Sequence, residues 1–297
     1  MDFYYRAFRI IKGTYRILKT EGPYKAIHCH NYFESALCMI AAKLAKVDIR
    51  ISHSHNDLSR VPYSKIRVIL QKIYRKINNR YATVKVACSQ VAFDYLFGKS
   101  QKGKIIYNAI DLDKFENKDK RYKKSSGSQL NLLHVGNFSP QKNQVFLVDL
   151  LKELLEEGIE AHLTLVGGES SYLNDVKNRI IQNKIEEYIT ILPQNTNISE
   201  IMYKNDLFLF PSIYEGLGIV LIEAQATGLK CIVSKAIPKE ADLGNIEYVN
   251  TYDLSEWINV IKTNHEKGIE RKKVNMCSYD IKRVCKQYRE IYNINKF

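Results

Sequence analysis

Several features that would assign a protein class at once are missing from this 297-residue sequence. Its six cysteines never form a Cys-x-x-Cys pair, the spacing typical of zinc and dithiol sites. Three of them stand in apolar runs that resemble strands, and we expect all six to be reduced and buried. The sequence has no uninterrupted apolar stretch of about 20 residues, and its first 20 residues hold no apolar core of a signal peptide. We therefore expect a cytoplasmic protein.

Composition and charge indicate a folded protein whose two halves differ. With 45% hydrophobic and 26% charged residues, the chain is typical of soluble globular proteins, and its length favours two domains. Residues 1 to 124 hold 26 Lys and Arg against 10 Asp and Glu, whereas residues 125 to 297 hold 19 against 22. The basic half indicates a membrane surface, a phosphorylated acceptor or nucleic acid as partner, or only a solvated basic face. No nucleic-acid-binding motif accompanies the charge, so we expect no nucleic-acid partner.

Short apolar runs alternate with amphipathic stretches along the whole chain. Runs that are apolar on both faces, such as Leu207 to Phe210, are typical of parallel strands covered by helices. The strands expected in the second half are 131–135, 162–166, 188–192, 207–210 and 231–234. Those expected in the first half are 26–29, 50–53, 84–88 and 105–107. This rhythm predicts an α/β fold with two Rossmann-like, doubly wound domains.

The same patterns predict the domain boundaries. A polar, Ser/Gly-rich stretch predicts a linker at 119–129. It separates an N-terminal domain at 1–118, which repeats the rhythm less completely and begins with a helix, from a C-terminal domain at 130–272. Apolar residues at helical spacing in 273–297 predict a final helix that braces both domains.

Ligands of open α/β sheets bind beyond the carboxyl ends of the strands, so the turns after the predicted strands are candidate sites. After strand 131–135, Gly136 lets a ligand approach the backbone, and Lys142 supplies a cation suited to a pyrophosphate. The same residues also fit a plain turn with a surface lysine. Gly167 and Gly168, after the next strand, are best explained as a tight turn.

A third turn, Pro211-Ser-Ile-Tyr-Glu215-Gly-Leu-Gly218, precedes a buried helix that we expect to begin at about Gly218. The amino end of that helix directs N–H groups and a positive dipole towards a ligand. Glu215 lies in the glycine-flanked loop and Glu223 about one turn into the helix, so both carboxylates can face one ligand. Carboxylates accept hydrogen bonds from vicinal diols, which suits Glu223 to a ribose and Glu215 to the hydroxyls of a sugar.

This segment, with Cys231-Ile-Val-Ser-Lys-Ala-Ile-Pro238 after it, resembles the large family of retaining glycosyltransferases (group 1, family 4) that build bacterial capsules and exopolysaccharides. The resemblance covers residues 130 to 245. It implies a GT-B fold with a nucleotide sugar held by the C-terminal domain, and transfer that retains anomeric configuration and requires neither metal nor cofactor. The donor-binding residues that it implies are Gly136, Asn137, Lys142, Glu215, Gly216, Leu217, Gly218 and Glu223.

The first half resembles the acceptor domain of this family through His28-Cys-His30 and Ile51-Ser-His-Ser-His55-Asn. The resemblance implies that His55, in preference to His53, lies near the donor sugar and the acceptor. It therefore implies a catalytic set of Glu215, His55 and Lys142.

Two departures from the family pattern change these expectations. Asn137 stands where an arginine is usual, so Lys142 and the helix end near Gly218 have to stabilise the leaving diphosphate. No glycine-rich phosphate loop precedes the first helix. We therefore expect an N-terminal domain that is truncated, wrongly assigned at its start, or completed by a partner chain.

The sequence thus predicts transfer of a hexosyl or N-acetylhexosaminyl group from a UDP- or GDP-sugar to a lipid-linked or polysaccharide acceptor. A basic amphipathic stretch, Val61 to Arg80, fits peripheral contact with the anionic inner face of the plasma membrane, or else a domain helix that buries its apolar stripe. Two alternatives stay open: a non-catalytic nucleotide-sugar-binding subunit of a transferase complex, and a GT-B nucleotide-sugar epimerase.

Overall fold

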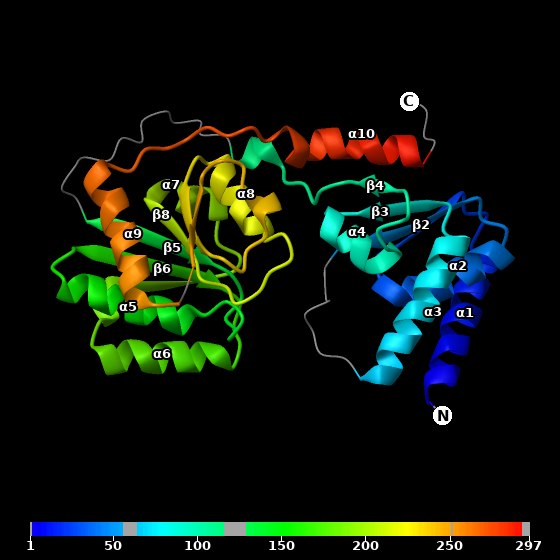
Figure 1. Cartoon of the computed structure of the whole chain (residues 1–297), viewed down its shortest axis with the longest axis horizontal. Coiled ribbons are helices and arrows are strands. Elements are labelled where there is room, and N and C mark those ends of the chain that lie inside the picture. Colours follow the sequence, from blue (N-terminus) through cyan, green and yellow to red (C-terminus); the bar gives the residue numbers. More distant parts are fainter. Residues whose placement is uncertain (1, 56–63, 116–128, 251, 293–297) are drawn as a thin grey trace. The chain divides into compact units, whose positions relative to one another are not determined.

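Two compact units, each built around one parallel sheet, make up the protein (Figure 1). The computed structural model describes residues 2–55, 64–115, 129–250 and 252–292. Residues 1–109 and 282–297 form the first unit, and residues 110–281 form the second. The predicted α/β fold with two Rossmann-like sheets is therefore confirmed. The predicted linker at 119–129 lies, except for its last residue, outside the described residues, and the predicted domain boundaries stay a prediction.

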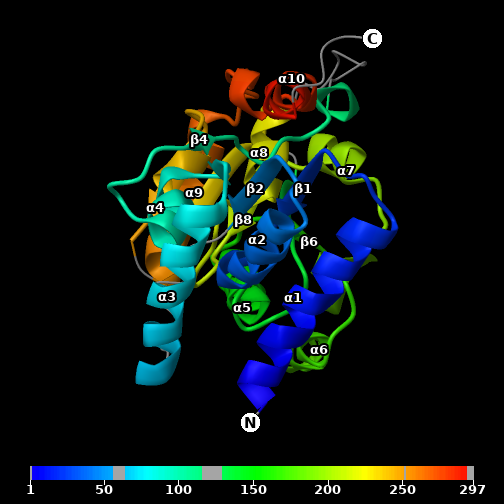
Figure 2. The same ribbon diagram turned by 90° about the vertical axis from the view of Figure 1, so that its right-hand side faces the viewer.

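The first unit contains a four-stranded sheet in the order β1-β2-β3-β4. Its elements are α1 (Asp2–Thr20), β1 (Ala26–Cys29), η1 (Tyr32–Glu34), α2 (Ser35–Leu44), β2 (Ile49–Ser54), α3 (Lys65–Tyr81), β3 (Val84–Ala87), α4 (Gln90–Phe97), β4 (Lys104–Ile105) and α10 (Ile281–Ile291). Figure 2 shows α2 between α1 and α3, and α2 contacts both of them. Serines cap two of these helices: Ser64 accepts from Arg67 N–H, and Ser89 from Ala92 N–H.

Side-chain alternation along β2 decides what covers each face of this sheet. Ile49 and Ile51 pack with Val284 and Ile291 of α10 in one buried cluster. Ser52, the residue after Ile51, points the other way and donates its hydroxyl to Asn78 of α3. Successive strand residues face opposite sides of a sheet, so α10 covers one face of β2 and α3 covers the other.

The second unit contains a six-stranded sheet in the order β10-β9-β8-β5-β6-β7. Its elements are η2 (Leu112–Lys114), β5 (Leu130–Val135), α5 (Gln144–Glu156), β6 (Ala161–Gly167), α6 (Tyr172–Asn183), η3 (Glu186–Tyr188), β7 (Ile189–Pro193), α7 (Ile198–Lys204), β8 (Leu207–Phe210), α8 (Ile219–Ala226), β9 (Lys230–Ser234), η4 (Lys239–Ala241), β10 (Ile246–Val249), α9 (Leu254–Lys267) and η5 (Cys277–Tyr279). The predicted strands match β5 to β9 within a residue at most ends. The four residues of β8 are all buried, as their apolar composition on both faces predicts.

The C-terminal helix begins later than the sequence pattern predicts. Residues 273–276 are irregular and α10 starts at Ile281. The backbone here pairs elsewhere: Ile110 N–H donates to Tyr279 O, and Ile281 N–H donates to Ile110 O. This parallel bridge uses groups that a continuous helix would have used itself. The predicted bracing of both domains by this helix stays a prediction.

The structure adds two elements that the sequence analysis did not list and corrects one expectation. Strand β10 and helix α9 follow β9. The cysteines are free, as expected, but they are not all buried, since Cys277 and Cys285 are exposed and Cys38 is half-buried. Cys277 lies on η5 and Cys285 on α10. On both elements, other residues form the buried face, so these two cysteines face solvent.

Candidate active site

The loops after β5 and β8 meet at one edge of the second sheet. From β5, the chain adds β6 and β7 on one side and then β8, β9 and β10 on the other, so the strand order reverses between β5 and β8. Ligands of open α/β sheets bind at this switch point. Hydrogen bonds hold the two loops together: Ile213 N–H donates to Gln141 O, and Gln141 Nε2 donates to Tyr214 O, each at 2.8 Å.

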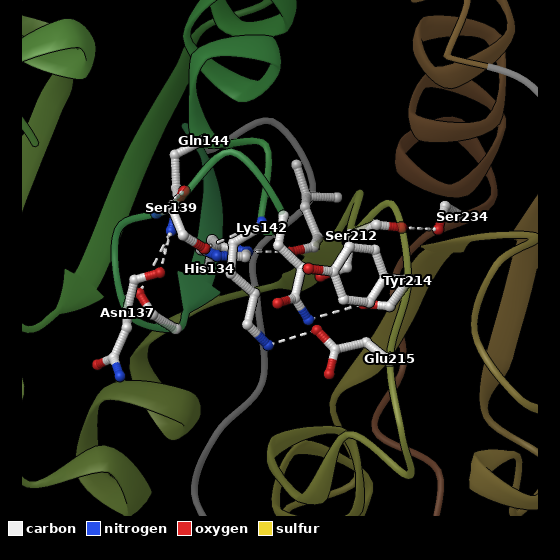
Figure 3. Close-up of polar contacts among 12 residues, drawn as sticks. His134, Asn137, Ser139, Lys142, Gln144, Ser212, Tyr214, Glu215 and Ser234 are labelled. Carbon is white, nitrogen blue, oxygen red and sulfur yellow. Dashed lines mark hydrogen bonds and ion pairs between the residues drawn. The ribbon is translucent and has the colours of Figure 1, made fainter. Parts of the chain in front are cut away.

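An ion pair joins two of the residues that the sequence singled out (Figure 3). Lys142 Nζ lies 2.5 Å from Glu215 Oε1, and the two side chains are only 18% and 9% exposed. The ammonium also lies 4.5 Å from the ring centroid of Phe210, a favourable cation–π distance. Asn137 is exposed, and its amide points away from the pair in Figure 3. Sequence reasoning gave Lys142 and Glu215 separate roles and missed that they bind each other.

Glycines bring backbone segments close together beside this pair. A Cβ atom on Gly136 would lie 3.3 Å from the side chain of Lys142. A Cβ atom on Gly167 would lie 2.4 Å from Gly136 O, which no real side chain tolerates. One on Gly168 would lie 2.7 Å from Gln194 Oε1. The expectation of a tight turn at Gly167 and Gly168 is therefore replaced by close packing, because neither residue has a positive φ.

The helix that follows the glutamate loop begins where the sequence predicts. Gly218 is the residue before α8 and has a φ of 69°, a left-handed conformation that favours glycine, and no side chain caps the helix. Leu217 is buried before it. Glu223 lies one turn into α8, and burial raises the pKa of its carboxyl. The amino end of α8 and the carboxyl of Glu223 are thus parts of the same short helix.

His134 is a buried polar residue in β5 that the sequence analysis did not single out. Its Nδ1 lies 2.9 Å from Leu209 O, so Nδ1 carries the proton, and its ring stacks on Phe210 at 5.7 Å. Burial lowers the pKa of His134 to about 4. Among the described residues its Nε2 has no hydrogen-bond partner. A histidine between the apolar residues Leu133 and Val135 was the signal that sequence reasoning passed over.

His55 belongs to the first unit, where it immediately follows β2. Its Nδ1 lies 3.3 Å from Asn108 Oδ1 and its Nε2 lies 2.6 Å from His30 Nδ1. His28 and His53 complete a cluster of four imidazoles, with 3.1 Å between His28 Nε2 and His53 Nδ1. The sequence predicted histidines at two successive strand ends, and the structure brings all four together.

Burial keeps these imidazoles neutral. Burial first, and the neighbouring histidines second, lower the pKa of His28 to about 4 and that of His53 to about 2. The pKa values of His30 and His55 are also lowered, again chiefly by burial. At neutral pH this end of the first sheet therefore offers lone pairs and N–H donors without positive charge.

Models of two known glycosyltransferase families match the two halves of the chain. Residues 115–245 match the family of glycosyl transferases group 1, and residues 1–114 match Glycosyltransferase Family 4. The crystal structure of HepE from Anabaena in complex with UDP has a TM-score of 0.78 to this chain at 20% sequence identity, covering 97% of this chain and 82% of HepE. The protein therefore has the GT-B fold, as predicted, and it belongs to the group 1 family of glycosyltransferases.

Two curated relatives indicate which kind of glycosyltransferase the chain resembles. The putative glycosyltransferase EpsF of Bacillus subtilis is 32% identical over 260 residues, which cover 84% of this chain and 67% of EpsF. The capsular polysaccharide biosynthesis glycosyltransferase CapH of Staphylococcus aureus is 28% identical over 279 residues, covering 90% of this chain and 76% of CapH. The chain is thus a glycosyltransferase similar to enzymes of polysaccharide and capsule synthesis.

Proposed function

We propose that this glycosyltransferase moves a hexosyl or N-acetylhexosaminyl group from a UDP- or GDP-sugar to a lipid-linked or polysaccharide acceptor, with retention of anomeric configuration. The observation that carries the proposal is the Lys142–Glu215 pair at the switch point of the second sheet. Similarity to HepE, which was crystallised with UDP, supports a nucleotide-sugar donor.

The ion pair supports a donor-binding mechanism in which partners are exchanged. Without donor, Glu215 compensates the charge of Lys142, so neither ion is left unpaired in a largely dry position. A bound diphosphate offers Lys142 a second anionic partner. The carboxylate of Glu215 then accepts hydrogen bonds from hydroxyls of the transferred sugar. Asn137 brings no charge, so the remaining positive potential on the leaving diphosphate comes from the amino end of α8.

The remaining proposed contacts follow from the same geometry. Glu223, one turn into α8, binds the ribose diol of the nucleotide, while Gly136, Gly216 and Gly218 allow the donor to approach the backbone. In the transfer step, the bond from the anomeric carbon to the phosphate oxygen breaks. A bond to the acceptor oxygen forms on the same face, and the acceptor proton passes to the departing phosphate. His55, neutral at pH 7, contacts the reacting sugar or the acceptor in this proposal.

A second surface supports a membrane-bound acceptor. On α3, Ile66 is 71% exposed and Ile69 is 59% exposed, so this helix does not bury its apolar stripe within the described residues. Lysines and arginines occur along the same helix. Such a surface fits peripheral binding to anionic lipid. None of the described helices is both long enough and apolar enough to span a bilayer.

Donor turnover by the purified chain tests this proposal. UDP- and GDP-sugars are supplied with membrane extract, and nucleotide binding and release are measured for the wild type, Lys142→Ala and Glu215→Ala. Lys152→Ala serves as the control because Lys152 forms an exposed ion pair with Glu156 on α5. We expect both site variants to lose binding and release, and the control to match the wild type.

The other outcomes separate the alternatives. Turnover by both site variants at the wild-type rate would reject this donor site. Binding without release, with acceptor present, would support a non-catalytic subunit. Conversion of the donor sugar to its epimer without nucleotide release would support the epimerase.

A further inference from the structure

Four histidines share one face at the carboxyl ends of β1 and β2. His28 and His30 are two residues apart, as are His53 and His55, and alternation in strands places residues at this spacing on the same side. The two strands are parallel neighbours, with His28 opposite Ile51 in register. The sequence pattern His-x-His on adjacent strands therefore produces a compact imidazole cluster within the first unit.

The distances in this cluster suit a metal ion. One ring nitrogen from each of His28, His30 and His53 lies within 4.8 Å of the others. Tetrahedral ligands at zinc–nitrogen distances of about 2.0 to 2.1 Å are about 3.3 Å apart, and the His28 Nε2 to His53 Nδ1 distance is 3.1 Å. The ring centroids of His28 and His53 are 5.2 Å apart, and those of His30 and His53 are 5.0 Å apart. Binding of an ion would replace the hydrogen bond between His28 and His53, and the rings would turn so that the three nitrogens face the ion.

Hydrogen bonds around the cluster orient the rings for coordination. Tyr292 Oη lies 2.6 Å from His28 Nδ1 and accepts its proton in the tautomer that leaves Nε2 with a free lone pair. Asn108 Oδ1 faces His55 Nδ1 in the same way. Metal-bound histidines commonly donate their other N–H to such an acceptor, which fixes the tautomer. The contact with Tyr292 comes from residues that follow α10 in the chain, far from β1 in sequence.

The three side chains differ in how far they are buried and in how easily solvent reaches them. His53 is 2% exposed, and its Nε2 has no hydrogen-bond partner among the described residues. His30 is exposed and leaves a route from solvent to the cluster.

We propose that His28, His30 and His53 bind one divalent transition-metal ion, with Zn²⁺ the best match to three imidazole ligands. The site joins the ends of β1 and β2 within the first unit, next to His55, for which the proposed function gives a contact with the reacting sugar or the acceptor. Its occupancy does not depend on the proposed function, because the ligands and their supports all belong to the first unit.

Metal titration of the intact, untagged and chelator-treated protein tests this site. Isothermal titration with ZnCl₂ is expected to give one bound ion per chain, and the melting temperature of the first unit is expected to rise with zinc concentration. His30→Gln is expected to weaken binding by at least about tenfold, and Tyr292→Phe by roughly 10- to 100-fold, because losing an orienting partner has that effect on metal affinity. His162→Gln, on β6 of the second unit, is the control and should bind as the wild type does.

Cobalt spectroscopy distinguishes histidine ligands from the nearby Cys29 and Cys38 thiols. Visible d–d bands without a thiolate charge-transfer band are the expected result. A thiolate band, or equal affinity in His30→Gln and the wild type, would overturn the proposal, as would the absence of any saturable binding. His53→Ala is a further test, and the exposed His30 keeps the test valid if loss of the buried His53 prevents folding.

Discussion

Replacing Lys142 with methionine tests whether the ion pair at the switch point is a structural unit. The change keeps most of the apolar stem but leaves the Glu215 carboxylate, 9% exposed, without its counterion at 2.5 Å. Breaking a buried pair in this way costs about 3 to 5 kcal/mol. Because the Lys142 side chain is 18% exposed, we expect the lower end, about 3 kcal/mol. For a unit of this size that corresponds to a fall of roughly 6 to 12 °C in melting temperature.

A double-mutant cycle isolates the pair from other effects of the substitution. Lys142→Met, Glu215→Leu and the double variant are compared by calorimetry on the transition of the second unit. The double variant should recover most of the lost stability, because it buries no unpaired charge. Lys152→Met breaks an exposed pair, whose side chains are 36% and 57% exposed, and should leave the stability close to that of the wild type because solvent screens the pair.

One result would refute the reasoning. If Lys142→Met is no more destabilising than Lys152→Met, solvent screens the Lys142–Glu215 pair. The exchange of partners proposed for donor binding then loses its basis. A stable double variant that no longer binds nucleotide sugar would separate the structural role of the pair from its role in recognition.

Three more predictions use other residues of the structure. Because burial raises the pKa of Glu223 in the folded state, Glu223→Gln should stabilise the second unit at pH 7; calorimetry should show this gain disappearing as the pH falls below the ordinary pKa of 4.5. His134 has its pKa lowered from 6.5 to about 4, so protonation of the unfolded chain should cost stability as pH falls through that interval, by about 3 kcal/mol in total. The free energy of unfolding of His134→Phe should therefore fall less steeply with decreasing pH than that of the wild type. Ile69→Ser should reduce co-sedimentation with anionic vesicles, whereas Ile181→Ser, equally exposed on α6, should not.

Much of the second unit was predictable because its strands are apolar on both faces. β8 is Leu-Phe-Leu-Phe and fully buried, and no other element type fits a run this short between polar turns. β10 was missed because its residues are mostly half-buried at the sheet edge, where Glu247 pairs with Lys230 at 3.1 Å. An edge strand with a charged residue carries little of the periodic signal on which such predictions depend.

The candidate site was predicted in part, for a related reason. The switch-point loops, Gly218 and the start of α8 follow from local rules on turns and helix ends. The pairing of Lys142 with Glu215 joins residues 73 positions apart, and no local pattern encodes it. The late start of α10 likewise depends on Ile110, which takes the hydrogen bonds of a distant segment.

The sequence by itself determined the alternation of strands and helices, the glycines at strand ends and the two His-x-His pairs, because each is a periodicity or a backbone requirement within a few residues. Only the tertiary structure decided which of these groups meet. Strand order places the loops after β5 and β8 side by side, and α10 brings Tyr292 to within 2.6 Å of His28. Charge compensation and histidine tautomers depend on such contacts, so they follow from the folded chain and not from any stretch of its sequence.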